Sequence, residues 1–269
     1  MKAREIANYI EKLAPIESGI AGDELGFIYG EPNSEVTAAA VTWSPTAGVL
    51  ADATAKGANF VICHEPLFFK AGGKDLEGAS SNWFEEAPDE EKIPNKKRLQ
   101  FLKAGAMMVY RAHTNWDIAP RLGVIDALAT KLSLGQPIGR GKATRVYEVQ
   151  PITLRDLADK VKTKLALKAV RVMGDPRQSL TKVGLAVGGL GQMFNSPEEL
   201  AMLGAEVGIF GEMLDYTFRC ARELNLAIIE TSHVASENPG MQSLAEALQD
   251  HFPEVKFLFL DSKIPWFFL

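Results

Sequence analysis

Two distant segments of the chain share one pattern. Residues 56–65 read Lys-Gly-Ala-Asn-Phe-Val-Ile-Cys-His-Glu, and residues 203–212 read Leu-Gly-Ala-Glu-Val-Gly-Ile-Phe-Gly-Glu. Each segment has a glycine typical of a helix end, then a short apolar run of strand length, then a glutamate. A repeated unit of this kind indicates a duplicated α/β fold rather than one irregular domain.

The alternation of helical and strand patterns extends along the whole chain. The first part predicts helices at 2–13, 44–56, 99–103 and 126–132, and strands at 36–43, 60–63 and 106–110. The second part predicts helices at 153–165 and 197–203, and strands at 146–149, 169–173, 183–187 and 226–229. Strands that alternate with helices form parallel sheets, whose ligands gather at the carboxyl ends of the strands.

We therefore predict an α/β fold of two half-domains related by a pseudo-twofold axis, with the functional site between them at strand carboxyl ends. The halves are residues 1–135 and 136–269. A polar stretch at 71–97, which contains Trp83 and Phe84, interrupts the first half. Matching residues are 204 − 57 = 147 positions apart before this stretch and 233 − 113 = 120 positions apart after it, as Gly57 with Gly204 and His113 with His233 show. The difference of 27 is about the length of the stretch. We interpret this stretch as a solvated loop, and a lid or a subunit contact is the alternative.

Composition and charge argue against two classes of partner. The net charge is -5, and the longest basic run is Lys96-Lys97-Arg98, so the electrostatic footprint of nucleic-acid binding is missing. No stretch approaches the ~18 apolar residues of a membrane span, and the polar start differs from a secretory signal. The chain has only two cysteines, which favours a reducing, cytoplasmic setting. We expect one of them, Cys63, to lie in the core.

Imidazoles and carboxylates follow three of the predicted strands. The chain has four histidines, and three of them stand in such places. The candidate ligands are His64 with Glu65, His113 with Asp117, and His233 with Glu237. Ligands bind at the ends of parallel strands, so these side chains predict a metal site. Structural histidines without a metal are the alternative, because each motif is common by itself.

The set of ligands constrains the metal. Six nitrogen and oxygen ligands without a thiolate suit Zn²⁺, Mn²⁺, Fe²⁺, Co²⁺ or Ni²⁺. Six ligands are too many for one tetrahedral ion, whereas two ions that share a carboxylate would use them and leave positions for water. The predicted cofactor is therefore a pair of divalent ions, and the pattern does not choose among the five metals.

Two further motifs stand near these strands. Gly188-Gly189-Leu190-Gly191 follows a predicted strand like a phosphate-cradling loop, but it lacks the order Gly-x-Gly-x-x-Gly, so a plain turn is favoured. Glu212 ends the second copy of the repeat and, together with Glu65, is a candidate to move protons. Asp215 and Tyr216, which follow Glu212, are expected at the surface or behind the ligands.

Taken together, these motifs resemble the NIF3 family, also called DUF34 or GTP cyclohydrolase 1 type 2 homologues. The matching segments are 62–69, 113–117, 170–175 and 232–240, together with the opening helix and the glycine-punctuated segment through Gly30. The resemblance implies a duplicated α/β fold of the short form, without an extra inserted domain. It also implies assembly into a toroidal hexamer with the metal ions facing the interior.

The resemblance further implies a ligand set for a dinuclear centre. The implied ligands are His64, Glu65, Asp117, His233 and Glu237, with Glu237 bridging the ions, and His113 is a ligand or lies just behind one. The family pattern has a second histidine where this chain has Glu65, which shifts the site toward harder metals. Many members carry Tyr-His after a Gly-Asp, whereas this chain has Tyr216 without that histidine in this region.

Two classes of function are open at this point. The first, which we favour, is a metal-dependent hydrolase acting on a small substrate of nucleotide or phosphate-containing type. The family name points to the opening of the guanine ring of GTP, but by name only. The alternative is a non-catalytic metal carrier or a regulatory scaffold that meets other proteins. A duplicated α/β fold that binds no metal is the third possibility.

Overall fold

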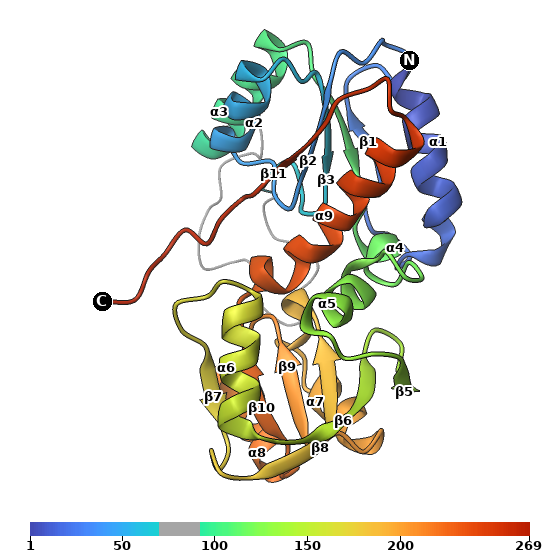
Figure 1. The fold of residues 1–269 in the computed structure, drawn as a ribbon. Helices are drawn as coiled ribbons and strands as arrows, with labels where there is room; N and C mark the ends of the chain where they lie inside the picture. The colour runs from blue at the N-terminus through green and yellow to red at the C-terminus, as the bar shows by residue number, and fades with distance from the viewer. Residues whose placement is uncertain (70–91) are drawn as a thin grey trace. The chain divides into compact units, whose positions relative to one another are not determined.

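A computed structural model describes residues 1–69 and 92–269. Contacts divide the chain into two compact units, one of residues 1–113 and 245–262 and the other of residues 114–244 and 263–269. Each unit holds one sheet (Figure 1). These units group residues by packing, whereas the predicted halves are sequence repeats, so the boundary predicted at residue 135 stays a prediction.

The first unit is built around a sheet with the strand order β1-β4-β3-β2-β11. Neighbouring strands are parallel except at the edge, where β1 is antiparallel to β4. In chain order the elements are α1 (Ala3–Leu13), η1 (Ile16–Ser18), β1 (Gly26–Tyr29), β2 (Ala39–Thr42), α2 (Ala47–Ala55), β3 (Phe60–Cys63), α3 (Ile93–Ala104), β4 (Met108–Arg111) and β11 (Phe257–Leu260).

The two faces of this sheet explain why its central strands are buried along their whole length. Successive side chains of a strand point to opposite faces. Val61 and Cys63 of β3 therefore share a face, and they join a cluster with Leu50 of α2 and Leu102 of α3. Phe60 points to the other face and stacks on Phe27. The core position predicted for Cys63 is confirmed.

Local sequence signals set the ends of α2 and α3. Thr46 caps α2, because its Oγ1 accepts a hydrogen bond from the Val49 N–H at 3.3 Å. Gly57 follows the helix with a φ of +77°, which confirms its expected role at the helix end. Helix α3 begins at Ile93, earlier than the expected residue 99, so the last part of the stretch predicted as a loop is helical. Trp83 lies outside the described residues, as does Phe84.

The second unit is built around a sheet with the strand order β5-β6-β8-β9-β10-β7. In chain order the elements are α4 (Thr114–Asp117), α5 (Val124–Leu132), β5 (Pro137–Arg140), β6 (Arg145–Thr153), α6 (Leu154–Lys164), β7 (Arg171–Met173), β8 (Ser179–Ala186), η4 (Gly188–Leu190), α7 (Asn195–Met202), β9 (Val207–Phe210), α8 (Asp215–Glu223), β10 (Ala227–Glu230) and α9 (His233–His251). Helix α9 begins in this unit and ends in residues assigned to the first.

The two sheets repeat one topology, which bears out the predicted duplication. In the first, the parallel strands β2, β3 and β4 end at the antiparallel edge strand β1. In the second, the parallel strands β8, β9 and β10 end at the antiparallel edge strand β7. Strands β3 and β9 carry the two copies of the repeated sequence. The sheets differ on the other side, where β11 is parallel to β2 but β6 is antiparallel to β8.

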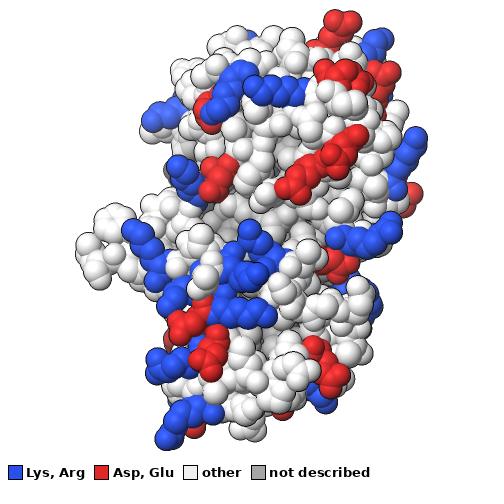
Figure 2. Space-filling view, viewed as in Figure 1, with Lys and Arg blue, Asp and Glu red and all other residues white. Residues whose placement is uncertain are grey.

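Helix α6 shows how the second unit separates its apolar and charged sides. Leu157 and Val161 are buried, and the helix begins where Oγ1 of Thr153 accepts from the Asp156 N–H at 3.1 Å, as predicted. Lys and Arg side chains gather over this helix on the face shown in Figure 2. Among the described helices, none combines the length and apolar character that a membrane crossing requires.

Candidate metal centre

His64 follows the end of β3 and is fully buried. Its Nδ1 donates to the backbone carbonyl oxygen of Ala112 at 2.9 Å. A carbonyl oxygen only accepts, so the neutral ring carries its lone pair on Nε2. A metal-binding histidine is usually oriented in this way, by a hydrogen bond from the ring nitrogen that does not bind the ion.

His113, two residues after β4, is held by an acid. Its Nδ1 lies 2.8 Å from Oδ2 of Asp23, and the other Asp23 oxygen accepts from Nη1 of Arg111 at 2.6 Å. The Nε of Arg111 donates to the carbonyl oxygen of His64 at 2.9 Å. Arg111 therefore connects Asp23, which holds the His113 ring, to the backbone of His64. The ring centroids of the two histidines lie 4.8 Å apart.

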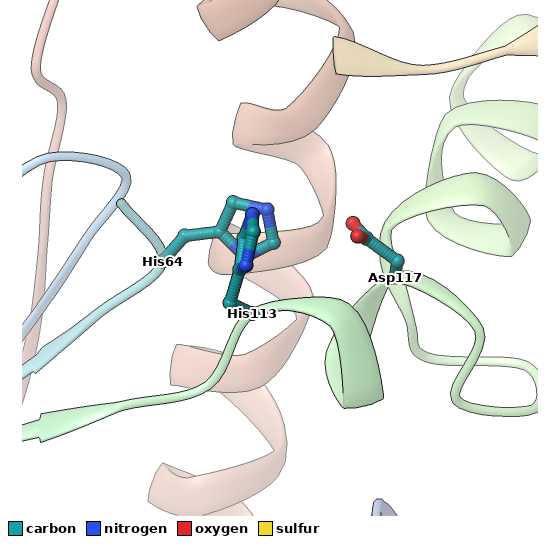
Figure 3. Close-up of side chains that lie close together, drawn as sticks. All are labelled: His64, His113 and Asp117. Atoms are coloured by element: carbon teal, nitrogen blue, oxygen red, sulfur yellow. The ribbon is translucent and has the colours of Figure 1, made fainter. Parts of the chain in front are cut away.

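Asp117 follows His113 by one turn of helix α4. A ring nitrogen of His64, a ring nitrogen of His113 and a carboxylate oxygen of Asp117 lie within 4.8 Å of one another (Figure 3). Two ligands that are each about 2.1 Å from one ion are roughly 3–4 Å apart, so small rotations of these side chains would suit a shared ion.

His233 begins helix α9 and lies next to two carboxylates. Its Nδ1 is 3.4 Å from Oε1 of Glu212, and its Nε2 is 3.2 Å from Oε2 of Glu237. The hydrogen bond from His233 lowers the pKa of Glu212, against the opposing effect of burial. A neutral imidazole donates only one hydrogen bond, so a ring that donates to Glu212 presents a lone pair to Glu237. A lone pair and a carboxylate are donors that a cation would use, but His233 is not among the three-residue groups of possible ligands that residues 1–69 and 92–269 bring together.

The turn η4 explains the Gly-Gly-Leu-Gly motif. Gly188 has a φ of +56°, and its N–H donates to Oγ of Ser236 at 2.9 Å. A Cβ on Gly188 would lie only 1.8 Å from Oε1 of Glu237. The glycine therefore lets the turn pack directly against the carboxylate, and the favoured interpretation of the motif as a turn is confirmed.

The same turn excludes a side chain at position 211. A Cβ on Gly211 would lie 2.4 Å from the carbonyl oxygen of Gly188. In the first unit, the equivalent position after β3 holds His64. The second unit therefore has no room for an imidazole directly after β9. Of the two residues at this strand end, Glu212 alone matches its equivalent, Glu65, in chemistry.

A comparison with known proteins assigns the chain to a family. The family model described as Duf34/NIF3 (NGG1p interacting factor 3) matches residues 1–265. The chain belongs to the NIF3 family. Among its NIF3 relatives, a GTP cyclohydrolase 1 type 2 homolog from Clostridium perfringens is 25% identical over 268 residues, which are 96% of this chain and 95% of that protein. A homolog of the same name from Nostoc sp. is 30% identical over 219 residues, covering 78% of this chain and 76% of its own.

A solved structure supports the NIF3 fold independently. The crystal structure of a Bacillus cereus protein related to NIF3 matches with a TM-score of 0.82 at 19% identity, and the match covers 100% of this chain and 99% of that one. At this identity the likeness shows the fold alone. The resemblance to the NIF3 family and the α/β fold predicted from the sequence are both confirmed.

Some residues of this NIF3 site are not found by sequence reasoning. In the first unit, Asp23 holds the His113 ring, and Arg111 donates to Asp23 and to the backbone carbonyl of His64. In the second unit, Ser236 accepts from the Gly188 N–H, and Gln192 donates to Glu212. The one sequence signal that could have found Arg111 is its charge, because it ends the apolar run before His113. Tyr216 and its neighbour at the start of α8 are exposed, as expected.

Proposed function

We propose that this NIF3 protein binds two divalent transition-metal ions and uses them to hydrolyse a small substrate that contains a nucleotide or a phosphate group. The proposed ligands are the six predicted side chains: His64, Glu65, His113, Asp117, His233 and Glu237. The observation that carries the proposal is the way in which the three histidines are held. Each has Nδ1 beside a carbonyl or carboxylate oxygen, which leaves Nε2 for an ion.

The chemistry of the donors supports the choice of metal. Nitrogen and oxygen ligands suit Zn²⁺, Mn²⁺, Fe²⁺, Co²⁺ and Ni²⁺. Cys63 directly precedes His64, but burial raises the pKa of its thiol to about 12, so no thiolate competes for the ion there. The carboxylates of Glu65 and Glu237 would offset the charge of the bound ions.

The side chains divide the remaining work of hydrolysis. Bound ions of this kind lower the pKa of a coordinated water and polarise a phosphoryl or carbonyl group. The lowered pKa of Glu212 keeps this carboxylate ionised, and we assign it to orienting the His233 ring. Glu65, next to His64, is the side chain that we assign to accept a proton. The remaining ligands position the ions and thereby the substrate.

Metal content tests the first part of the proposal. We expect the chain to bind two ions, as measured by elemental analysis after dialysis against Zn²⁺ or Mn²⁺. The variants His64→Ala and His233→Ala should each bind less. His251→Ala is the matched control, because this fourth histidine stacks on Tyr9 and is not a proposed ligand. Equal metal content in all four proteins would contradict the proposed site.

Turnover tests the second part. The metal-loaded protein should hydrolyse at least one member of a panel of nucleotides and phosphomonoesters, and chelation followed by reloading should remove and restore the activity. A non-catalytic metal carrier would use the same ligands but would pass its ions quickly to an acceptor chelator. Fast transfer without turnover from a fully loaded protein would therefore contradict hydrolysis and favour the carrier.

Two further properties belong to this proposal. By family resemblance we propose a homo-oligomer, a toroidal hexamer, which light scattering of the purified chain would test. We also propose that the protein acts in the cytoplasm, in keeping with its buried, unpaired Cys63. A monomer at micromolar concentration, with its metal content intact, would contradict the oligomer and leave the metal site standing.

A further inference from the structure

A cavity of about 310 Å³ lies in the second unit against α5, β5 and β6, and we call it the arginine cavity. Its charged lining consists of Arg121, Arg140, Arg145 and Asp126. Three guanidinium groups and one carboxylate leave a surplus of two positive charges. The volume is at the lower end of the range for small-molecule sites.

Two polar side chains of this lining are buried side by side. Arg145 and Tyr147 stand two residues apart on β6 and therefore point to the same face of the sheet. Arg145 is 7% exposed and Tyr147 is 0% exposed. The Tyr147 hydroxyl and the Arg145 Nε make no hydrogen bond with any side chain or backbone group of residues 1–69 or 92–269. A buried polar group without a partner costs about 1–3 kcal/mol, so such groups call for an explanation.

The charges around Tyr147 keep its hydroxyl a hydrogen-bond donor. Burial raises the pKa of Tyr147 to about 12, and the Asp126 carboxylate acts in the same direction, whereas Arg145 and Arg140 act in the opposite one. The Arg145 guanidinium is fixed in place, because its Nη1 donates to the carbonyl oxygens of Thr144 and Gly141 at 2.8 and 3.3 Å. The Arg145 guanidinium is thus oriented before any ligand arrives.

We propose that the arginine cavity binds the phosphate group of a small phosphorylated molecule, to which Tyr147, Arg145 and Arg140 donate hydrogen bonds. A phosphate monoester is a dianion near neutral pH, which matches the surplus of two positive charges. Guanidinium groups pair well with phosphate oxygens, and charge-assisted hydrogen bonds of this kind are the strong ones. The ligand would supply the partners that the buried hydroxyl and the Arg145 Nε lack within the protein.

The basic hollow beside α6 shows what distinguishes the arginine cavity. That hollow has a similar volume of about 300 Å³ and is lined by Arg155, Lys162 and Lys168. Its basic side chains are exposed or half-buried, and Lys162 already pairs with Asp159 at 2.7 Å. It has charge but no aligned, buried donor, so it serves as the internal comparison.

Calorimetric titration of the full chain tests the proposal. The titrants are inorganic phosphate, AMP, adenosine and succinate, at constant ionic strength and with EDTA present, so that the result does not depend on the metal centre. We expect phosphate and AMP to bind, and adenosine and succinate to bind at least about 10-fold more weakly. Tyr147→Phe and Arg140→Gln should each weaken AMP binding about 10-fold or more, since each loses a hydrogen bond to a charged group. Arg155→Gln is the matched control and should bind AMP as the parent does.

Several outcomes would overturn the proposal. The cavity is not a phosphate site if neither phosphate nor AMP binds at millimolar concentration, or if succinate binds in their place. The same conclusion follows if Tyr147→Phe and Arg140→Gln bind AMP as tightly as the parent, or if Arg155→Gln weakens binding equally.

The arginine cavity lies close in sequence to a proposed metal ligand, because its lining begins at Ile118, the residue after Asp117. AMP binding that survives in His64→Ala would show that the cavity stands apart from the proposed metal site.

Discussion

The two copies of the repeated sequence end in residues that differ in what they can offer an ion. After β3 the chain presents His64 and Glu65, whereas after β9 it presents Gly211 and Glu212. The difference has a physical cause, because the backbone of Gly188 fills the space that a side chain at position 211 would need. Equivalent positions of a duplicated fold thus have unequal room, and the turn that follows β8 decides which of them can carry a ligand.

Replacing Gly211 with histidine is the most direct way to break this comparison. We expect Gly211→His to lower the free energy of unfolding by about 3 kcal/mol or more, since its Cβ would lie 2.4 Å from the Gly188 carbonyl oxygen. Urea denaturation measures the change. Gly48→His is the control, because a Cβ at Gly48 meets its nearest atom only at 3.9 Å. Equal stability of the two variants would show that the turn gives way.

The two cysteines, one in each unit, differ in burial, so the reactivity of their thiols compares the two interiors. Burial raises the pKa of Cys63 from 9.0 to about 12, whereas Cys220 is partly exposed, and burial raises its pKa as well. Cys63 should react with a thiol reagent at pH 8 at least about 100-fold more slowly than Cys220. A Cys220→Ser chain isolates the slow thiol, and a single fast phase for both thiols in the parent would contradict the burial.

The raised pKa of the Cys63 thiol also predicts how the free energy of unfolding changes with pH. A folded pKa above the unfolded value means that the contribution of this thiol is fully present below pH 9 and is lost as pH rises toward 12. A Cys63→Ala variant should therefore lose less stability than the parent between pH 9 and pH 11. Parallel stability curves over that range would contradict the expectation.

The two acids that hold the histidines test whether the units support the metal equally. Asp23→Asn should weaken Zn²⁺ binding about 100-fold, and Glu212→Gln about 10-fold, as competition with a chelator would measure. The Asp23 side chain is 11% exposed and is shared with Arg111, whereas that of Glu212 is 40% exposed. Glu17→Gln, on the exposed turn η1, is the control. Unchanged affinity in both variants would remove these acids from the site.

The residues that precede His113 and His233 give the smallest expected effect. Ser232 has a φ of +144°, a region that L side chains rarely adopt, whereas Ala112 has no such strain. Ser232→Gly should raise the stability by about 1 kcal/mol, because the relief of strain exceeds the few tenths lost with the helix cap on Ala235. Ser18→Gly, in an ordinary conformation, should not stabilise. Destabilisation by Ser232→Gly would mean that the cap matters more than the strain.

The sequence predicted the parallel strands well, because strands buried on both faces read as apolar runs. It also singled out the candidate ligands, since histidines and acids stand at the ends of those runs, and their role stays a prediction. The supports of the ligands could not be predicted in the same way. Asp23 reaches Arg111 across 88 residues, in a contact that depends on β1 lying antiparallel beside β4. The full length of α9 was hidden too, since Pro239 inside it ordinarily signals a helix end.

Strand β11 has a consequence for the newly made chain. Residues 1–113 emerge first from the ribosome, but their sheet receives its strand beside β2 only when Phe257–Leu260 has been made. Until then β2 offers an open row of N–H and C=O groups, an edge on which other chains can pair. The strands of the second unit are contiguous in sequence and need no such wait. The sheet that begins later in the chain is therefore the first to have all of its strands available for pairing.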